Sequence, residues 1–324
     1  MNGLFQQRKY WLHYYCITEC LMALDTHGVL QTLVARQSAT AADLARASGT
    51  DARMLAAVLD FLSVTTPLLV RVGDRYEARP EARARVLSFM LDIGGAYRPV
   101  FRDLPELLSG VRKYGVDTRR DGDRVQRASA RATRGAIPFV ARRFAEHGVR
   151  TVVDLGCGAG ELLVSLCAAE GVDGYGIDAD PASLAAASAK GLEVRPGNIE
   201  DPSALDHVPR DKPIGLCAMG VMHEFLRDGE EALVALLARY RQRFPGAVFA
   251  VVEFDAVSVD EMAATDDEEM LLAASYYQLI HPLSGQGDPQ PEVRWLTIFE
   301  RAGWRAASVD RAPFRMVVYT LTPA

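Results

Sequence analysis

A glycine-rich turn in the middle of the chain is flanked by two acids, and this pattern predicts a small-molecule site. Residues 154–161 read DLGCGAGE and follow an apolar run. Glycines allow a backbone to approach a ligand closely at the start of the following helix; the three here are Gly156, Gly158 and Gly160. Asp178 ends the next apolar run, at a position where an acid accepts hydrogen bonds from ribose hydroxyls.

The two acids restrict which nucleotide the turn can hold. A dinucleotide site needs G-x-G-x-x-G, whereas the spacing here is G-x-G-x-G and Glu161 takes the sixth place. Asp154 would repel a pyrophosphate but attract an ammonium group. S-adenosylmethionine has a ribose at one end and an amino-acid ammonium at the other, so we expect it as the cofactor. A glycine turn without a ligand would leave both acids unexplained, and a dehydrogenase would have to bind dinucleotides instead.

A histidine beyond a later predicted strand is a candidate base. His223 lies just after the apolar run 214–219, and Glu253 ends the next one. Ligands of open parallel sheets bind beyond the carboxyl ends of the strands, so Glu253 is expected to orient the imidazole. Methyl transfer from a sulfonium requires an aligned, electron-rich acceptor, and a base with a pKa near the working pH provides it. The alternative is a surface histidine with no role.

The elements that position these residues alternate between strand and helix. Five short apolar runs predict strands, at 151–155, 174–177, 192–195, 214–219 and 247–253. Alternation of this kind implies a parallel sheet with helices on both faces. Runs 304–309 and 314–321 are joined by a turn so short that they must pair antiparallel. We therefore predict an α/β fold with a Rossmann-like, seven-stranded, mostly parallel sheet closed by an antiparallel hairpin.

The first 115 residues predict a separate, mainly helical domain. Apolar stripes and the capping pattern TAAD at 40–43 predict short helices, and residues 68–72 and 75–78 predict a hairpin. Three helices and a hairpin describe a winged helix. Its third helix, 52–61, has Arg53 as its one cation, which favours packing or dimerisation over DNA binding. We place the domains at 1–115 and 116–324.

Charge and composition exclude several classes of partner. The chain has 324 residues, 49% of them hydrophobic, and a net charge of -6, so nucleic acid is not expected. Five cysteines without a C-x-x-C pair suit a reducing cytoplasm. No apolar run approaches the ~20 residues of a membrane helix. A polar linker is predicted from about residue 116, with Arg119 and Arg120 in it. Beyond it, four arginines predicted on one face of a helix from 124 to 146 are either solvated or meet a carboxylate at the active site: Arg124, Arg127, Arg131 and Arg134.

The glycine turn resembles the first motif of class I S-adenosylmethionine-dependent methyltransferases. The predicted final hairpin also suits the sheet of that family. The resemblance implies that Asn198 and Ile199, after the third strand, lie in the adenine region. It also implies that Met219 and Gly220, after the fourth strand, line the sulfonium side.

The chain as a whole is similar to the two-domain small-molecule O-methyltransferases. The similarity extends over residues 10–80, 97–110, the glycine turn, 222–237 and 295–304. It implies a homodimer formed through the N-terminal winged helix, a small-molecule acceptor, His223 as the base and Glu253 as its supporting acid. Glu224 and Phe225 stand where that group has Asp-Trp.

A second histidine departs from that group. His281 lies in the run YYQLIHPLSG, residues 276–285. Together, His223, Glu224 and His281 would supply two imidazoles and a carboxylate for a divalent metal such as iron or zinc. Such a metal would polarise the ketone of a 2-oxo acid and acidify the neighbouring C–H, an arrangement similar to the 2-oxo-acid C-methyltransferases. The alternative to a metal-binding role is that His281 caps a turn before Pro282.

Three functions therefore remain in view. The first is metal-assisted C-methylation beside the ketone of a 2-oxo acid. The second is metal-free O-methylation of a phenolic or other hydroxyl group with His223 as general base. The third is a transcriptional regulator that keeps a methyltransferase-like domain as a sensor, for which the acidic charge is unfavourable.

Overall fold

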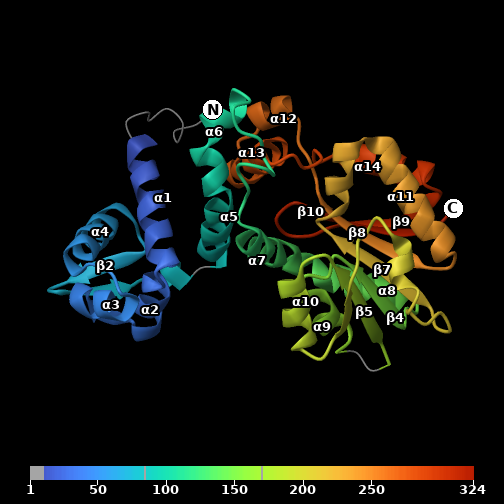
Figure 1. Cartoon of the computed structure of the whole chain (residues 1–324), viewed down its shortest axis with the longest axis horizontal. Helices are drawn as coiled ribbons and strands as arrows, with labels where there is room; N and C mark the ends of the chain where they lie inside the picture. The colour runs from blue at the N-terminus through green and yellow to red at the C-terminus, as the bar shows by residue number, and fades with distance from the viewer. Residues whose placement is uncertain (1–10, 84, 169–170) are drawn as a thin grey trace. The chain divides into compact units, whose positions relative to one another are not determined.

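The chain folds into two compact units. The computed structural model describes residues 11–83, 85–168 and 171–324. The first unit contains the described residues up to Arg98 together with Asp121–Ala128, and the second contains Pro99–Arg120 and Ser129–Ala324 (Figure 1). The domain boundary predicted near residue 115 lies within the segment Pro99–Arg120.

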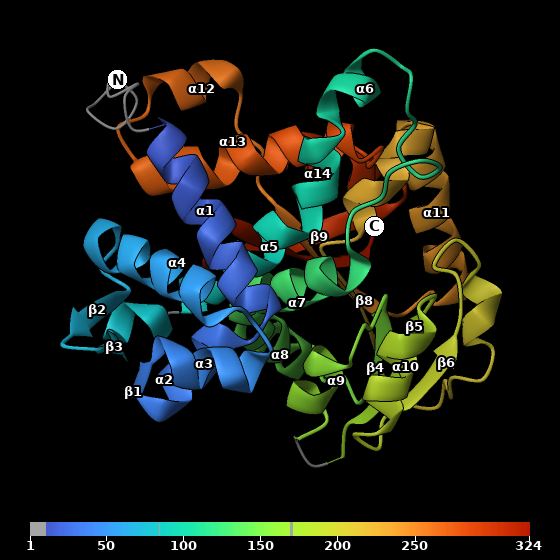
Figure 2. The same cartoon turned by 60° about the vertical axis from the view of Figure 1, so that its left-hand side comes forward.

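The first unit combines helices with a small antiparallel sheet (Figure 2). Its sheet has the strand order β1-β3-β2, and the predicted hairpin is present as β2 and β3. Side-chain caps begin two of the helices, since Thr40 accepts a hydrogen bond from the amide of Asp43 and Asp51 from that of Met54. The elements are α1 (Trp11–Thr26), α2 (Val29–Arg36), β1 (Ser38–Thr40), α3 (Ala41–Ser48), α4 (Ala52–Thr65), β2 (Leu69–Val72) and β3 (Arg75–Ala78).

The segment between the hairpin and the large sheet departs from the sequence prediction. It consists of η2 (Pro80–Arg83), α5 (Arg85–Arg102), α6 (Leu104–Leu108), α7 (Gly122–Thr133), η3 (Arg134–Ala136) and α8 (Ile137–Glu146). The single helix predicted over 124–146 is wrong. A 3-10 turn at η3 interrupts it, and Pro138 lies in the first turn of α8, where a proline is tolerated. Within the first unit, Arg124 pairs with Asp25 and Arg127 with Asp92.

The second unit is built on the predicted seven-stranded sheet. The strand order is β6-β5-β4-β7-β8-β10-β9. Strands β4 to β8 pair parallel with one another, and β10 is antiparallel to both β8 and β9. The α/β prediction with a closing antiparallel hairpin is confirmed. The strands are β4 (Thr151–Leu155), β5 (Asp173–Asp178), β6 (Glu193–Pro196), β7 (Ile214–Met219), β8 (Val248–Phe254), β9 (Trp304–Arg311) and β10 (Met316–Pro323).

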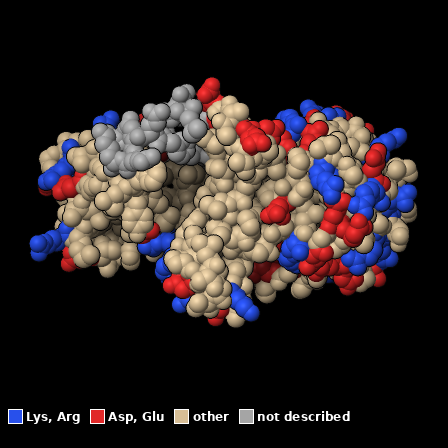
Figure 3. All heavy atoms as spheres, turned by 90° about the horizontal axis from the view of Figure 1, so that it is seen from above, with Lys and Arg blue, Asp and Glu red and all other residues tan. Residues whose placement is uncertain are grey.

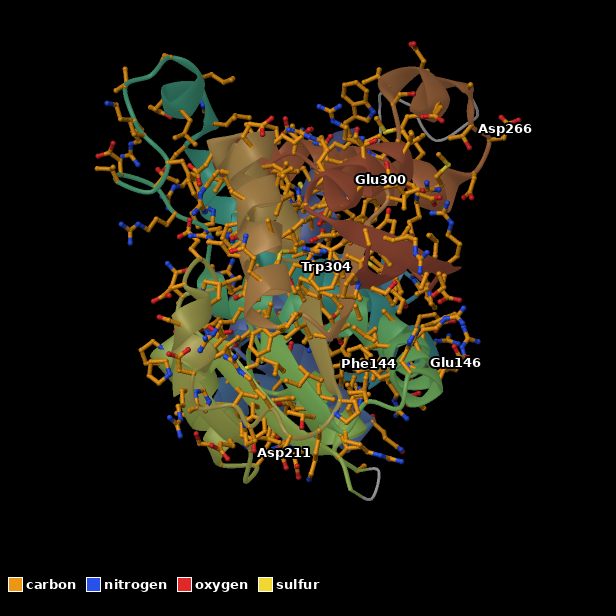
Figure 4. The ribbon with its side chains drawn as sticks, turned by 90° about the vertical axis from the view of Figure 1, so that its right-hand side faces the viewer. Phe144, Glu146, Asp211, Asp266, Glu300 and Trp304 are labelled. Carbon is orange, nitrogen blue, oxygen red and sulfur yellow. The ribbon has the colours of Figure 1, made fainter. Side chains whose placement is uncertain are left out.

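Two apolar cores cover the two faces of this sheet. Along β7, Leu216 and Ala218 join the core formed with α11 (Glu230–Arg243) and α14 (Glu292–Arg301). Cys217, between them, joins the core formed with α8 and α9 (Glu161–Leu166). This alternation follows from the two-residue period of a strand. Trp304 belongs to the first core (Figure 4), where its indole N–H donates to a carbonyl of α11.

The remaining elements lie between the strands and beyond their ends. They are α10 (Pro181–Ser188), η4 (Pro202–Leu205), η5 (Met222–Asp228), α12 (Val259–Ala264) and α13 (Glu268–Leu283). Asp211 precedes β7 and lies at one end of this unit in Figure 4, while Asp266, between α12 and α13, lies at the other end. The α12–α13 connection is therefore at the end of the unit towards which β7 runs.

Two general properties of the described residues bear on partners. No helix among them combines the length and the apolar character needed to cross a membrane. On the face of the second unit seen in Figure 3, basic and acidic side chains are interspersed rather than gathered into a patch of one sign.

Candidate active site

The glycine turn joins β4 to α9 in a conformation that requires glycine. Gly160 is the N-cap residue of α9, and its φ of 79° lies in the left-handed region. A Cβ at this position would lie 2.2 Å from Leu192 Cδ1. The backbone amides of Gly156 and Cys157 donate to the carbonyl of Ile177 at 2.9 and 3.0 Å, which fixes the turn to the end of β5.

Asp178 lies at the turn, where the sequence places it. One carboxylate oxygen accepts a hydrogen bond from the amide of Gly158 at 2.8 Å. The other accepts from the amide of Asp180, also at 2.8 Å. Each carboxylate oxygen can accept more than one hydrogen bond, so both retain capacity for ribose hydroxyls.

Asp154 is the buried partner of Asp178. Only 4% of its surface is exposed. Burial, followed by the charge of Asp178, raises the pKa of Asp154 to about 7. Because the two neighbouring carboxylates repel each other, a cation bound between them would be strongly stabilised.

The segments expected to contact the adenine and the sulfonium follow β6 and β7. Ile199 is buried, and its side chain would lie 3.3 Å from a Cβ at Gly156. Asn198 is exposed and hydrogen-bonds Glu200. Gly220 follows Met219, and its amide donates to Val252 of β8 at 2.7 Å. The structure thus brings Ile199 against the glycine turn, whereas the Asn198 side chain interacts with Glu200 in the same loop.

His223 and Glu253 meet in the interior, as the sequence predicts. His223 lies in η5 and is 3% exposed, and Glu253 lies in β8 and is 1% exposed. The imidazole Nδ1 is 2.8 Å from Glu253 Oε2, while Oε1 accepts from the amides of Met222 at 2.7 Å and His223 at 3.1 Å. Burial alone would lower the pKa of His223, but the charge and hydrogen bond of Glu253 outweigh it, so that the pKa is raised.

His281 lies against His223 and belongs to a helix. It is in the last turn of α13, which continues through Pro282, so the histidine does not cap a turn before that proline. Its Nε2 lies 3.1 Å from Nε2 of His223, and its Nδ1 lies 2.5 Å from the carbonyl of Tyr277. Burial and the charge of His223 lower the pKa of His281 to about 3, so this imidazole is neutral.

The hydrogen-bond partners assign the tautomers of both rings. His281 donates from Nδ1 to a carbonyl, so its Nε2 has only a lone pair. His223 donates from Nδ1 to Glu253, so its Nε2 also has only a lone pair when the ring is neutral. A hydrogen bond between the two Nε2 atoms forms when His223 is protonated, which agrees with its raised pKa.

The expected metal set of His223, Glu224 and His281 is not assembled. Glu224 Oε1 accepts hydrogen bonds from Arg120 at 3.2 Å and from Gln286 at 2.6 Å. Burial acts to raise the pKa of Glu224, but the charges of Arg120 and His223 act in the opposite direction and outweigh it. The pKa of Glu224 is therefore lowered. Among the residues that the structure describes, no group of three or more His, Cys, Asp or Glu side chains is arranged to hold a metal. The prediction fails because Glu224 pairs with a cation and an amide instead.

Sequence reasoning missed three residues of this site. Arg120 lies in the predicted linker and Gln286 follows α13, and no spacing rule connects either residue to Glu224. Tyr277 stacks on Phe254 with ring centroids 4.2 Å apart and packs against His281 at 4.1 Å. Its position four residues before His281 on the same helix was the one available signal.

The chain shares its fold with solved methyltransferase structures. A family model described as "Methionine biosynthesis protein MetW" matches residues 139–236, less than half of the chain. None of the curated proteins matches the sequence.

Particular solved structures resemble the whole chain. Human N-acetylserotonin methyltransferase, solved in complex with S-adenosylmethionine, has a TM-score of 0.73 at 15% identity, covering 100% of this chain and 99% of that one. An O-methyltransferase family protein from Burkholderia thailandensis has a TM-score of 0.70 at 15% identity, with the same coverage. The mitomycin 7-O-methyltransferase has a TM-score of 0.67 at 16% identity, covering 97% and 96%. At these identities the likeness defines the fold.

Proposed function

We propose that this protein is an S-adenosylmethionine-dependent methyltransferase that acts on a small metabolite. The observation on which the proposal rests is the placement of Asp154 and Asp178 at the glycine turn of a methyltransferase fold, with one of the two acids too buried to ionise readily. Solved neighbours of this fold were obtained with S-adenosylmethionine or S-adenosylhomocysteine, which supports the same cofactor here.

The residues around the turn fit that cofactor. Asp178 would accept hydrogen bonds from the ribose hydroxyls, and Asp154 would ionise beside the ammonium group. The turn glycines, Gly156, Gly158 and Gly160, would allow close backbone approach. We place the adenine beside Asn198 and Ile199, and the sulfonium beside Met219 and Gly220. The bound cofactor supplies an activated methyl group.

We propose His223 as the general base for an acceptor hydroxyl, phenolic or otherwise. Neutral His223 has its lone pair on Nε2, because Nδ1–H donates to Glu253. Nε2 would take the hydroxyl proton as the oxygen attacks the methyl carbon. Glu253 would then stabilise the imidazolium, and the neutral His281 would accept its Nε2–H.

A second candidate acceptor is the carbon beside the ketone of a 2-oxo acid. The observation in its favour is His281, whose Nε2 lies 3.1 Å from Nε2 of His223 and supplies a second imidazole beside the base. A divalent metal such as iron or zinc would polarise the ketone in this reaction. The described residues do not fit a three-ligand site, because Glu224 is engaged by Arg120 and Gln286, and we assign no step to a metal.

One experiment tests the activity and separates the two acceptors. The protein is incubated with methyl-labelled S-adenosylmethionine and a panel of phenols and 2-oxo acids, and products are analysed by mass and proton NMR. A methoxy product supports the first acceptor, and a C-methyl product supports the second. Metal analysis accompanies the second outcome, with His281→Ala as the variant expected to lose any stoichiometric metal. No labelled product from either series refutes both acceptor assignments.

We also propose that the N-terminal domain forms a homodimer. Trp11, Leu12 and Tyr15 of α1 are large apolar side chains exposed on the first unit, and exposed apolar patches mark interaction sites. Sedimentation velocity on the whole chain tests this proposal, which fails if the protein is monomeric at micromolar concentration.

A further inference from the structure

The loop that follows α13 packs directly on the backbone of η5. At Gly287, a Cβ would lie 2.0 Å from the carbonyl oxygen of His223 and 2.8 Å from the amide nitrogen of Arg227. Both atoms belong to the backbone, so a side-chain rotation cannot relieve the contact. Gly287 does not have a positive φ, and the close approach alone therefore requires glycine here.

The same loop, residues 284–288, is bonded to α13 and to Glu224. The amide of Gln286 donates to the carbonyl of His281 at 3.1 Å. The Gln286 side chain donates to Glu224 at 2.6 Å, and its oxygen accepts from the hydroxyl of the buried Ser284 at 2.9 Å. Because an ionised carboxylate can only accept, the contact with Glu224 fixes which end of the Gln286 amide is the donor, and Gln286 presents its N–H groups to Glu224.

We infer that Gly287 and Gln286 are positioning residues that set the placement of His223 relative to His281. One loop contacts the backbone of the first histidine and hydrogen-bonds the backbone of the second, although the two lie on separate elements. The role in catalysis rests on the proposed function, whereas the role in geometry does not.

The geometry indicates how large the effect of an added methyl group is. Real Cβ atoms essentially never lie within 3.0 Å of another non-bonded atom, whereas a Cβ at Gly287 would lie 2.0 Å from the carbonyl oxygen of His223. To accept an alanine, η5 or the loop must therefore move by about 1 Å. His223 Nδ1 lies 2.8 Å from Glu253, which is fixed in β8. A displacement of about 1 Å at reacting groups can lower turnover by ~10²-fold.

Gly287→Ala tests the inference, with Gly246→Ala as its control. Gly246 also lacks a positive φ, and a Cβ there meets no atom within 4 Å. Imidazole nitrogen NMR of the whole protein reports the two histidines, and calorimetry with S-adenosylhomocysteine reports the cofactor site. We expect shifted His223 and His281 signals in Gly287→Ala only, with unchanged affinity for S-adenosylhomocysteine. With an acceptor that the wild type methylates, kcat falls by ~10²-fold and the KM for S-adenosylmethionine stays constant.

Unshifted imidazole signals in Gly287→Ala would overturn the inference. If this variant does not fold, Gln286→Leu and Gln286→Asn decide, because neither adds volume at the backbone contact. Gln286→Leu is then expected to shift the same imidazole signals, with at least partial restoration by Gln286→Asn, and signals that match the wild type in both variants would overturn the inference. Absence of S-adenosylhomocysteine binding to the wild type would refute the proposed function, and the imidazole signals would still test the positioning.

Discussion

Replacement of Glu253 by glutamine is the most informative single change at the proposed base. The Glu253 carboxylate is buried and accepts three hydrogen bonds, from the amides of Met222 and His223 and from the His223 imidazole. Glutamine has nearly the same shape, but it is neutral and has one acceptor oxygen. At least one donor therefore loses its acceptor, and the imidazolium loses its counter-charge.

The size of the effect follows from these contacts. Hydrogen bonds to charged groups contribute about 1.5–3 kcal/mol each, and removal of one partner of a buried ion pair costs about 3–5 kcal/mol. We therefore expect Glu253→Gln to lower the free energy of unfolding by about 3 kcal/mol. Loss of the carboxylate that orients a catalytic histidine lowers kcat by ~10⁴-fold in a Ser-His-Asp triad, so we expect a loss of ~10²–10⁴-fold here.

The pH dependence of Glu253→Gln provides a second test of the His223–Glu253 pair. A base works when it is neutral, so kcat/KM rises with pH through the pKa of His223, which Glu253 raises. In Glu253→Gln the acid limb moves to lower pH, while the plateau falls. For stability, a raised pKa in the folded protein means that the stabilisation is fully present below the unfolded histidine pKa of about 6.5 and is lost as pH rises through the folded pKa.

The assay combines methyl-transfer rates across pH with urea unfolding on either side of that range. Glu300→Gln is the control, because Glu300 is an exposed carboxylate on α14 (Figure 4). A Glu253→Gln enzyme with the plateau and acid limb of the wild type would refute the role assigned to this pair.

Three further predictions concern the cofactor site and the first unit. Because the pKa of Asp154 is raised to about 7, calorimetry should show that affinity for S-adenosylmethionine weakens as pH falls below 7, and Asp154→Asn should remove this dependence together with most of the affinity. Gly160→Ala, which is strained at a φ of 79°, should lower the unfolding free energy by about 1–3 kcal/mol and weaken binding of S-adenosylhomocysteine. Leu44→Ala, in the core of the first unit, should cost about 2–5 kcal/mol in urea unfolding without changing that binding; a parallel loss of affinity would contradict it.

The large sheet and its ligand edge were predictable because they depend on local patterns. Each strand is a short apolar run, and the two-residue period of the strands survives in both cores. Asp178, His223 and Glu253 follow or end strands, and parallel strands bring their carboxyl ends to one edge. The pairing of His223 with Glu253 was therefore visible from topology alone.

The contacts of Glu224 were not predictable, because they depend on loops. Its partners Arg120 and Gln286 lie far away in the sequence, and neither belongs to a periodic element. His223, Glu224 and His281 have the residue types of a metal site. The direction in which each side chain points depends on tertiary packing, which the sequence pattern does not reveal. The alternative in which His281 caps a turn before Pro282 is wrong, because α13 continues through that proline.

Isothermal titration calorimetry with S-adenosylmethionine is the decisive measurement for the proposed pair of carboxylates, Asp154 and Asp178, at the cofactor site. We expect one binding site per chain in the wild type and no binding of NAD. When Asp154 and Asp178 are both changed to asparagine, we expect an affinity at least about tenfold lower, equivalent to about 1.4 kcal/mol. Absence of binding heat in the wild type, or an unchanged affinity in the folded double variant, would contradict the proposed role of this pair.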